Sequence, residues 1–334
     1  MSRRPVIALA MMEGLRDAAF RPDQLDRLAD LGHLVDREPL TEFTSDRAAE
    51  VLRTAEVLVG HWGCPTLTAD VVAKAPALEL FAYAAGTVKW QVVDATFERG
   101  LIITSAAAAN ARPVAEFTVG AIMLANKGAF LAAAAERGDL VRFDRARIGN
   151  LGKRIGLVGA SFVGRQVIEL LQAMSMDLQL GVADPYLSRA EADRLGVELM
   201  ELDALCEWCD VLSLHAPLVD ATRNLLGAPQ LALLRDQATI INTARGALIE
   251  PEALLDHLQS GRLSAILDVT DPEPLPKDHP LRRLPNVVLT PHLAGAEGQE
   301  LWRLADCAID EVERFVTGMP PRYPVRREDL ERIA

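Results

Sequence analysis

The chain contains 334 residues, of which 50% are apolar and 25% are charged, a globular composition that excludes disorder as its main theme. At roughly 150 residues per domain, this length predicts two domains. Basic residues number 35 and acidic residues 47, so the net charge of −12 argues against nucleic acid and anionic membrane surfaces as partners. The longest apolar runs are shorter than the roughly 18 residues that a membrane-spanning helix needs.

The N-terminus combines a basic start with a short apolar run, as signal peptides do. Glu13 ends this run and no small-residue cleavage site follows, so we expect residues 5–11 to form a buried strand. The four cysteines are too few and too scattered for a disulfide framework. Cys206 and Cys209 form a C-x-x-C pair, but no second pair or histidine cluster completes a zinc site, and the pair fits the end of a helix. We therefore expect no metal and a reducing compartment, the cytoplasm.

Short apolar runs of strand length alternate with helical periods along the chain. In the first third we predict strands at residues 5–11, 55–59, 78–84 and 101–104, with helices that include 24–31 and 68–74. In the second half we predict strands at residues 154–158, 178–183, 211–214, 239–242, 265–269 and 287–289. This alternation predicts an α/β fold, and the near-continuous apolar strands predict parallel sheets covered on both faces.

Two longer helices accompany these strands. Residues 113–126 are rich in Ala and Val, and Pro113 fits the first turn of a helix that joins two α/β lobes. Residues 301–317 are amphipathic and end at Gly318, a typical helix stop. A two-lobed protein of this kind usually binds its ligand in a cleft.

The sharpest local signal is the sequence G-A-S-F-V-G at residues 159–164, between a predicted strand and a predicted helix. Gly159 suits the tight turn, Gly164 lets helix and strand pack closely, and the N–H groups that open the helix favour a pyrophosphate. Ser161 stands where the middle glycine of G-x-G-x-x-G is expected. After the next predicted strand, Asp184 can accept a hydrogen bond from a ribose 2′-hydroxyl and would repel a 2′-phosphate. These residues predict a dinucleotide site that prefers NAD to NADP.

Three polar residues follow at or just past the carboxyl ends of predicted strands, namely Arg245, Glu273 and His292. Ligands bind at this edge of open α/β sheets. Singly, each fits an ordinary role, as a surface arginine, a solvated loop glutamate or a turn histidine. Together they provide an imidazole to donate or accept a proton, a carboxylate to orient it, and a guanidinium to bind a substrate carboxylate and polarise its carbonyl. These groups supply what hydride transfer at an alcohol carbon needs.

With these motifs the chain resembles the D-isomer-specific 2-hydroxyacid dehydrogenase family, which includes phosphoglycerate dehydrogenase and glyoxylate/hydroxypyruvate reductases. The resemblance is strongest over residues 155–295. It rests on residues 159–164, 184–186, 214–218, 242–246, 267–269, 273–274 and 290–295, and it extends more weakly to residues 98–100 and 114–116. It implies an NAD-dependent oxidoreductase acting on 2-hydroxy and 2-keto acids, commonly a homodimer.

Residue by residue, the resemblance implies that Arg245, Glu273 and His292 are catalytic. It implies that the amides of Phe162 and Val163, beside Gly159, Ser161 and Gly164, bind the pyrophosphate and that Asp184 binds the ribose. The further cofactor contacts that it implies are Ala216 and Pro217 on the adenosine side and Thr243, Ala244, Asp268, His292 and Gly295 near the nicotinamide carboxamide.

The implied fold has two Rossmann-like lobes with parallel sheets, in which a cofactor lobe (residues 112–295) is inserted into a flavodoxin-like substrate lobe (residues 1–111 and 296–334). The family's substrate-carboxylate loop matches residues 84–86, so Ala85 and Gly86 are expected to bind substrate together with Arg245. The family often has an acidic or amide residue soon after this glycine, whereas this chain has Lys89. Lys89 either directs positive charge toward an anionic or phosphorylated substrate or extends along the cleft rim with its charge in water.

Two other functions share this architecture. The corepressors called C-terminal-binding proteins carry the same motifs and sense dinucleotides, and an exposed peptide groove that would distinguish them cannot be recognised in a sequence. Formate dehydrogenases need no proton exchange at an oxygen and typically pair their histidine with glutamine, so Glu273 argues against them. The acidic composition favours the enzyme, and the identity of the 2-keto acid stays open.

Overall fold

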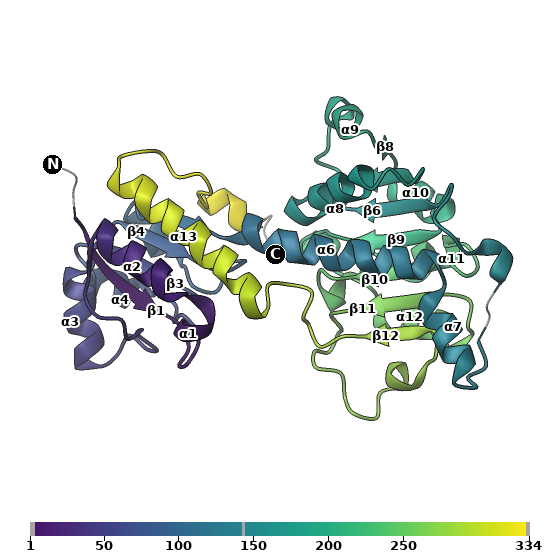
Figure 1. Cartoon of the computed structure of the whole chain (residues 1–334), viewed down its shortest axis with the longest axis horizontal. Coiled ribbons are helices and arrows are strands. Elements are labelled where there is room, and N and C mark those ends of the chain that lie inside the picture. Colours follow the sequence, from purple (N-terminus) through teal and green to yellow (C-terminus); the bar gives the residue numbers. More distant parts are fainter. Residues whose placement is uncertain (1–3, 142–143, 332–334) are drawn as a thin grey trace. The chain divides into compact units, whose positions relative to one another are not determined.

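The computed structural model describes residues 4–141 and 144–331. The chain forms two compact units, which we call unit 1 and unit 2 (Figure 1). Unit 1 runs to Asn110 and resumes at Ala296, and unit 2 comprises Ala111–Gly295. Each unit has its own parallel sheet, which confirms the predicted α/β fold with two parallel sheets.

The sheet of unit 1 has the strand order β2-β1-β3-β4-β5, in which all neighbours are parallel. The predicted strands all form. The two-residue edge strand β2 was not predicted because it is too short to show a hydrophobic period. The strands are β1 (Val6–Ala10), β2 (His33–Leu34), β3 (Val57–Gly60), β4 (Leu80–Tyr83) and β5 (Ile102–Ser105).

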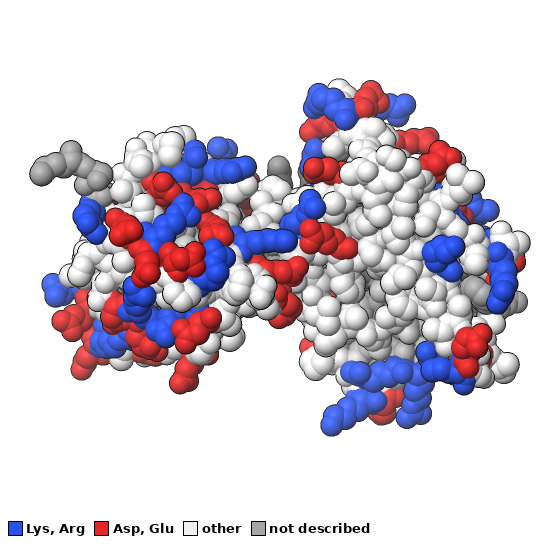
Figure 2. Space-filling model, in the orientation of Figure 1, with Lys and Arg blue, Asp and Glu red and all other residues white. Residues whose placement is uncertain are grey.

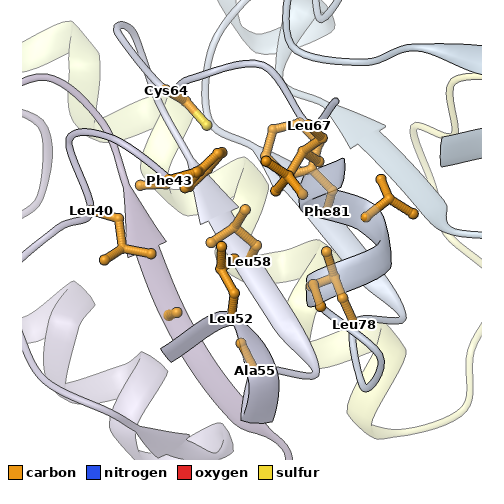
Figure 3. Close-up of a cluster of buried hydrophobic side chains, with 14 of the residues drawn as sticks. Leu40, Phe43, Leu52, Ala55, Leu58, Cys64, Leu67, Leu78 and Phe81 are labelled. Carbon is orange, nitrogen blue, oxygen red and sulfur yellow. The ribbon is translucent and has the colours of Figure 1, made fainter. Parts of the chain in front are cut away.

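Apolar side chains of helices cover both faces of this sheet. One face carries the cluster drawn in Figure 3, in which Leu52 and Phe81 are fully buried. The opposite face packs against α2 and against α13, whose Leu304 and Ile309 are fully buried, so the C-terminal helix completes unit 1. The helices of unit 1 are α1 (Arg16–Ala19), α2 (Pro22–Leu31), α3 (Asp46–Thr54), α4 (Ala69–Lys74), α5 (Asp94–Glu98) and α13 (Leu301–Val316).

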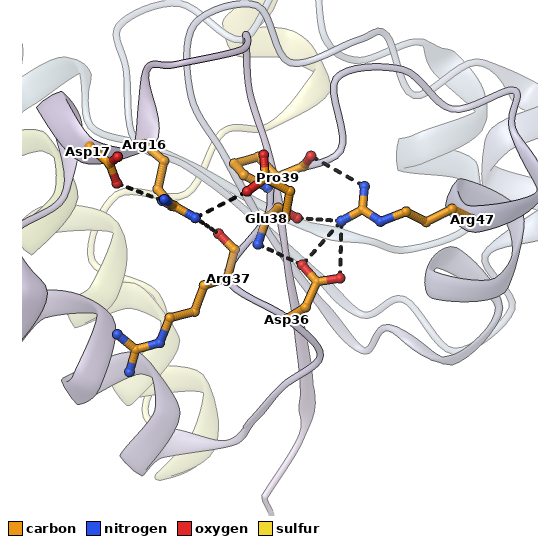
Figure 4. A network of polar contacts seen from close by, with 7 residues as sticks. All are labelled: Arg16, Asp17, Asp36, Arg37, Glu38, Pro39 and Arg47. Atoms are coloured by element: carbon orange, nitrogen blue, oxygen red, sulfur yellow. Dashed lines mark hydrogen bonds and ion pairs between the residues drawn. The ribbon is translucent and has the colours of Figure 1, made fainter.

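A polar network holds the segment that follows β2 (Figure 4). Arg16 of α1 donates to the carbonyl oxygen of Arg37 and forms ion pairs with Asp17 and Glu38. Arg47 of α3 donates to both carboxylate oxygens of Asp36 at 3.1 Å. Because these charges are exposed, the network orients the loop and contributes little to stability.

The sheet of unit 2 has the order β12-β11-β10-β9-β6-β7-β8, again parallel throughout. The predicted strands form here too, and the two-residue β8 is the one that was not predicted. The strands are β6 (Arg154–Val158), β7 (Gln179–Ala183), β8 (Glu198–Leu199), β9 (Val211–Leu214), β10 (Thr239–Asn242), β11 (Ser264–Leu267) and β12 (Val287–Leu289).

A long helix, α6 (Ala107–Asn126), carries the chain from unit 1 into unit 2, as predicted, but it begins earlier than expected. The prediction that Pro113 lies in the first turn is wrong, because Pro113 is inside the helix. The Ser105 hydroxyl accepts a hydrogen bond from the Ala107 amide at 3.0 Å, and the alanines that follow are strong helix formers. The other helices of unit 2 are α7 (Ala129–Glu136), α8 (Phe162–Ala173), α9 (Arg189–Leu195), α10 (Leu202–Trp208), α11 (Ala228–Leu233) and α12 (Pro251–Gln259).

The C-x-x-C pair lies where α10 ends and β9 follows, as the sequence predicts. Cys206 and Cys209 are buried free thiols, and burial raises the pKa of Cys206 to about 12. A buried thiol of this kind is inert, so the pair serves packing. No single described helix is long and apolar enough to cross a membrane. Helices α6 and α7 meet these two criteria only when they are taken together, as a pair bent by 59°.

Candidate functional site

The glycine-rich turn of unit 2 follows β6 directly. Gly159 has φ +98°, and a Cβ atom there would lie 2.8 Å from the amide nitrogen of Ala216. At Gly164 a Cβ atom would collide with the carbonyl oxygen of Gly159. Glycine is therefore required at both positions, once for the backbone conformation and once for close packing of α8 on the turn.

Ser161 replaces the middle glycine without strain, because its φ of −69° is ordinary for any residue. Serine at the start of a helix normally caps the first amides. Here the Ser161 hydroxyl donates instead to the carbonyl oxygen of His215 at 2.9 Å, and no side chain caps α8. The amides of Phe162 and Val163 therefore stay open at the positive end of a 12-residue helix, where a pyrophosphate binds well.

Asp184 follows β7 at the same sheet edge. Its carboxylate accepts hydrogen bonds from the amide of Ala160 at 2.7 Å and from the amide of Tyr186 at 2.8 Å. These bonds fix the carboxylate beside the glycine-rich turn while leaving it partly exposed. The open amides, the two required glycines and this carboxylate fit the pyrophosphate and ribose of a dinucleotide.

His215 lies beneath the turn and was not singled out from the sequence. The side chain is 4% exposed; its Nε2 contacts the Ser213 hydroxyl at 3.0 Å, and its Nδ1 has no partner. Burial lowers the pKa of His215 to about 3, so the imidazole is neutral near pH 7. Ala216 and Pro217 continue the chain from here, and the backbone of Ala216 lies against Gly159.

The turn after β10 presents Arg245. The buried side chain of Asn242 bridges this turn, since it accepts from the Ala244 amide at 3.0 Å and donates to the Arg245 carbonyl oxygen at 2.9 Å. The Thr243 hydroxyl contacts that of Thr118, a residue of α6, at 3.0 Å. An asparagine directly at a strand end was the available signal for this bridge.

Gly246 brings the arginine turn against the next loop. A Cβ atom at Gly246 would collide with the carbonyl group of Thr270, so the two backbones touch. Glu273 lies in this second loop. Burial lowers the pKa of Arg245, and the negative charge of Glu273 opposes that shift.

Asp268, at the end of β11, organises the loop that carries His292. Its carboxylate is 2% exposed and accepts hydrogen bonds from the Thr290 hydroxyl at 2.6 Å and from the amides of Leu293 and Ala294 at 2.8 and 2.9 Å. The carbonyl oxygen of Asp268 accepts from the His292 amide at 2.9 Å. From the sequence, Asp268 is expected beside the cofactor, but this anchoring contact is not predictable, because the bonds join residues far apart in the chain.

His292 and Glu273 form a direct pair. Nδ1 of His292 lies 2.5 Å from Oε1 of Glu273, and the side chains are 51% and 39% exposed. His292 has φ +57°, a left-handed conformation that costs a non-glycine residue about 1 kcal/mol or more. The bonds to Asp268 hold this conformation. Since Nδ1 is occupied by Glu273, Nε2 is the ring nitrogen left for a substrate oxygen.

The residues expected to bind substrate, apart from Arg245, belong to unit 1. Ala85 and Gly86 follow β4, and the Ser105 hydroxyl donates to the carbonyl oxygen of each. The Lys89 amide donates to the Thr87 hydroxyl at 3.3 Å, and the Lys89 side chain is half-buried. This turn is therefore fixed within unit 1. Gly295, the last expected cofactor contact, is the final residue of unit 2.

Taken by itself, unit 2 has the fold and the phosphate-binding turn of a dinucleotide-binding domain, with the His292–Glu273 pair at the same sheet edge. Residues 120–294 match the sequence profile described as "D-isomer specific 2-hydroxyacid dehydrogenase, NAD binding domain". The chain therefore belongs to the D-isomer specific 2-hydroxyacid dehydrogenase family, and the cofactor of unit 2 is NAD. This confirms the resemblance inferred from the sequence.

Relatives along the whole chain agree with this assignment. The chain is 36% identical over 303 residues to D-3-phosphoglycerate dehydrogenase of Methanocaldococcus jannaschii, an alignment that covers 89% of this chain and 56% of that protein. It is 31% identical to glyoxylate reductase of Aeropyrum pernix, covering 78% of this chain and 79% of the relative. The chain thus spans little more than half the length of the phosphoglycerate dehydrogenase.

A solved structure gives the same picture of the fold. The phosphoglycerate oxidoreductase from Rhizobium etli superposes with a TM-score of 0.80 at 25% identity, covering 97% of this chain and 99% of that chain. The D-mandelate dehydrogenase of Rhodotorula graminis, at 23% identity and a TM-score of 0.80, shares the fold.

Proposed function

We propose that the protein is an NAD-dependent D-2-hydroxyacid dehydrogenase that works physiologically as a 2-keto acid reductase. The observation that carries this proposal is the His292–Glu273 pair, 2.5 Å apart on loops at the carboxyl edge of the NAD-binding sheet. Hydride transfer to a ketone needs a proton at the oxygen, and an imidazole held by a carboxylate delivers one.

NAD, when bound, supplies or accepts the hydride. His292 gives a proton from Nε2 to the substrate oxygen during reduction and takes it back during oxidation. Glu273 fixes the ring through Nδ1 and stabilises the charged imidazolium. The Asp268 carboxylate holds the His292 loop, so it acts on the proton transfer through position.

Arg245 is proposed to bind the substrate carboxylate and to polarise the carbonyl. Its guanidinium is partly buried and donates to the neighbouring Ala244 carbonyl oxygen at 2.6 Å. Partial burial strengthens its attraction to an anion, because water screens the charge less. The negative charge of Glu273 partly offsets the effect of burial on the pKa of Arg245.

The cofactor contacts follow from the geometry of unit 2. Asp184 selects NADH over NADPH, because a carboxylate accepts from a ribose hydroxyl and repels a phosphate. The remaining proposed contacts are Gly159, Ser161, Phe162, Val163, Gly164, Ala216, Pro217, Thr243, Ala244, Asp268 and Gly295.

The two predicted domains divide the work. Residues 112–295 are proposed to hold the cofactor and the acid–base pair, and residues 1–111 with 296–334 to recognise the substrate. In the substrate domain, the turn at Ala85 and Gly86 is proposed to bind the substrate carboxylate, with Lys89 adding positive charge nearby. This turn follows β4, and its carbonyl oxygens are held by Ser105, so its amides are presented in one conformation.

An NADH-oxidation screen tests the proposal. The purified protein is assayed with glyoxylate, hydroxypyruvate, phosphohydroxypyruvate, phenylpyruvate and 2-ketogluconate, each with NADH and with NADPH. We expect turnover of at least one keto acid and a kcat/KM with NADH at least ten times that with NADPH. Tight NADH binding without turnover of any of them would instead indicate a dinucleotide sensor, and equal use of both nucleotides would remove Asp184 from its role.

The surface of unit 2 supports the further proposal of a homodimer. On the face seen in Figure 2, unit 2 is largely free of charged residues, whereas charges of both signs are spread over unit 1. Unit 2 also exposes large apolar side chains at Leu124 (44%), Leu140 (99%) and Leu151 (83%). A second copy of this chain would cover such apolar surface. Light scattering should give twice the 36.3 kDa chain mass for the wild type. Leu140→Asp should lower this measured mass. A wild-type protein with the mass of a monomer would refute the dimer.

We also propose a reducing compartment, the cytoplasm. The support is that all four cysteines are free thiols.

A further inference from the structure

The two sheets share one topological feature. In unit 1 the chain moves from β1 to β2 on one side and then to β3 on the other side of β1. In unit 2 it moves from β6 to β7 on one side and later to β9 on the other side of β6. Such a switch point leaves a crevice beyond the carboxyl ends of the two strands, and open parallel sheets bind ligands there. In unit 2 the glycine-rich turn occupies this place.

A buried histidine marks the switch point in both units. His215 is the first residue after β9, and His61 is the first residue after β3. Each side chain is at most 4% exposed, each retains one ring nitrogen without a partner, and burial lowers the pKa of His61 to about 4. The residues above the two histidines differ in chemistry. Unit 2 offers glycines and open amides, which suit phosphate, whereas unit 1 offers Met12 and Trp62.

Hydrogen bonds fix the backbone of these two residues at the edge of unit 1. The Met12 amide donates to the carbonyl oxygen of Trp62 at 2.8 Å, which ties the loop after β1 to the loop after β3. His61 positions Trp62, since its Nδ1 accepts from the Trp62 amide at 2.7 Å and the two rings meet edge to face at 5.1 Å. A Cβ atom at Gly63 would lie 2.5 Å from that of Met12, so glycine makes room for the methionine.

The loop after β4, which carries the proposed substrate turn, joins the same layer. The Thr66 hydroxyl donates to the carbonyl oxygen of Trp90 at 2.8 Å, and the Leu67 amide donates to that of Gln91 at 2.8 Å. The loops after β1, β3 and β4 thus form one hydrogen-bonded surface. Met12 is 48% exposed on it and Trp62 is half-buried.

Charge is scarce on this surface. Of residues 11–15, 61–68 and 84–93, all within the described part of the chain, only Glu13 and Lys89 carry a formal charge. Arg16, the next cation along the chain, is already neutralised by Asp17 and Glu38 (Figure 4). A phosphate dianion beside the substrate carboxylate would need several cations, and residues 11–15, 61–68 and 84–93 provide one, Lys89. A thioether and an indole suit an uncharged apolar group.

We propose that Met12 and Trp62 form the subsite for the substrate's side chain and select 2-keto acids whose side chain is aryl or branched alkyl over those with a phosphate or carboxylate. This inference rests on the proposed reductase function and adds the substrate class. It assigns His61 as a positioning residue for the indole of Trp62.

Steady-state kinetics with saturating NADH test the substrate class. We expect kcat/KM for phenylpyruvate or 4-methyl-2-oxopentanoate to exceed that for phosphohydroxypyruvate and oxaloacetate at least tenfold. Preference for either anionic substrate would overturn the subsite while leaving the reductase function standing. No turnover of any keto acid would instead be a failure of the proposed function.

A matched pair of charge insertions tests the location. Met12 and Met319 both belong to unit 1 and are exposed to 48% and 46%, but Met319 follows α13 and is not part of the three loops. Met12→Lys should reverse the preference toward oxaloacetate at least tenfold, because the new ammonium group neutralises the second carboxylate. Met319→Lys should leave the ratio of kcat/KM for oxaloacetate to kcat/KM for phenylpyruvate within twofold of wild type. Equal ratios in the two variants would refute the subsite.

Trp62→Ala tests the indole itself. The variant should lose at least tenfold in kcat/KM for phenylpyruvate through a higher KM, while kcat/KM for glyoxylate, which has no side chain, stays within threefold. NADH affinity, measured by fluorescence titration, should not change. A uniform loss on both substrates would indicate a merely structural role for Trp62, and the conservative variant Trp62→Phe should then fail to restore phenylpyruvate turnover.

Discussion

The carboxyl edges of the two sheets have the same strand arrangement and opposite chemistry. In unit 2 this edge carries Asp184, Arg245, Glu273 and His292, each fixed by bonds to backbone or to another side chain. In unit 1 the corresponding edge carries Met12, Trp62 and the small residues of the substrate turn. Both edges are built over a buried, neutral histidine. In the function that we propose, the same topology serves chemistry in one unit and recognition in the other.

This difference separates the residues proposed for the reaction from the residues proposed for substrate recognition. Reaction chemistry depends on charged groups at fixed positions, so replacing them should change turnover. Recognition depends on the shape and polarity of a surface, so replacing its residues should change the ratio between substrates. Variants in unit 2 and unit 1 should fall into these two classes.

The largest expected effect is that of His292→Ala. Without the imidazole no group delivers the proton, and we expect kcat to fall at least 10²-fold while NADH affinity, measured by fluorescence titration, stays nearly unchanged. The exposed His33, replaced by Ala, serves as the control and should retain wild-type turnover. Turnover near wild type in His292→Ala would exclude this residue as the acid.

Gly246→Ala should have the next largest effect. The added methyl group collides with the Thr270 carbonyl and pushes the loops of Arg245 and Glu273 apart, so kcat/KM should fall at least tenfold. Gly120 in α6 is the matched control, because nothing lies within 4 Å of a Cβ atom there. Gly120→Ala should keep full activity and raise the free energy of unfolding by about 1 kcal/mol. Equal activities of the two variants would contradict the loop contact.

Glu273→Gln should lower turnover by a smaller factor. The Glu273 carboxylate holds the His292 ring through Nδ1 at 2.5 Å, and an amide in its place removes the negative charge beside the ring. We expect kcat for the keto acid to fall roughly fivefold while NADH affinity, measured by fluorescence titration, stays unchanged. Wild-type turnover in this variant would show that the carboxylate does not support proton transfer by His292.

The smallest expected effect concerns the buried histidines. Folding lowers the pKa of His61 to about 4, below the 6.5 of an exposed histidine, so the unfolded chain binds more protons as pH falls from 6.5 to 4. Stability from this group is present above pH 6.5 and is lost toward pH 4. Urea denaturation at pH 6.5 and at pH 5 gives the loss of unfolding free energy on acidification. In His61→Phe this loss should be about 2 kcal/mol smaller than in wild type. An unchanged loss would mean that His61 titrates normally in the folded protein.

Much of the fold could be predicted because its signals are local. Residues 154–158 form β6 as predicted, and the other predicted strands differ from the structure by a few residues at most. Apolar runs of this length bury both faces of a strand, so hydrophobicity alone locates them. The start of α6 could not be predicted from Pro113, because the Ser105 hydroxyl and the alanines before the proline extend the helix.

The sequence by itself determined the glycine-rich turn and the candidates Arg245, Glu273 and His292, because backbone sterics at a glycine and the chemistry of a side chain are properties of the residues themselves. Only the tertiary structure decided that Asp268 anchors the His292 loop, that Ser161 bonds to His215, and that Met12 meets Trp62 at the edge of unit 1. Each of these contacts joins segments distant in the chain. Their partners are set by the order of strands in a sheet, which no local pattern encodes.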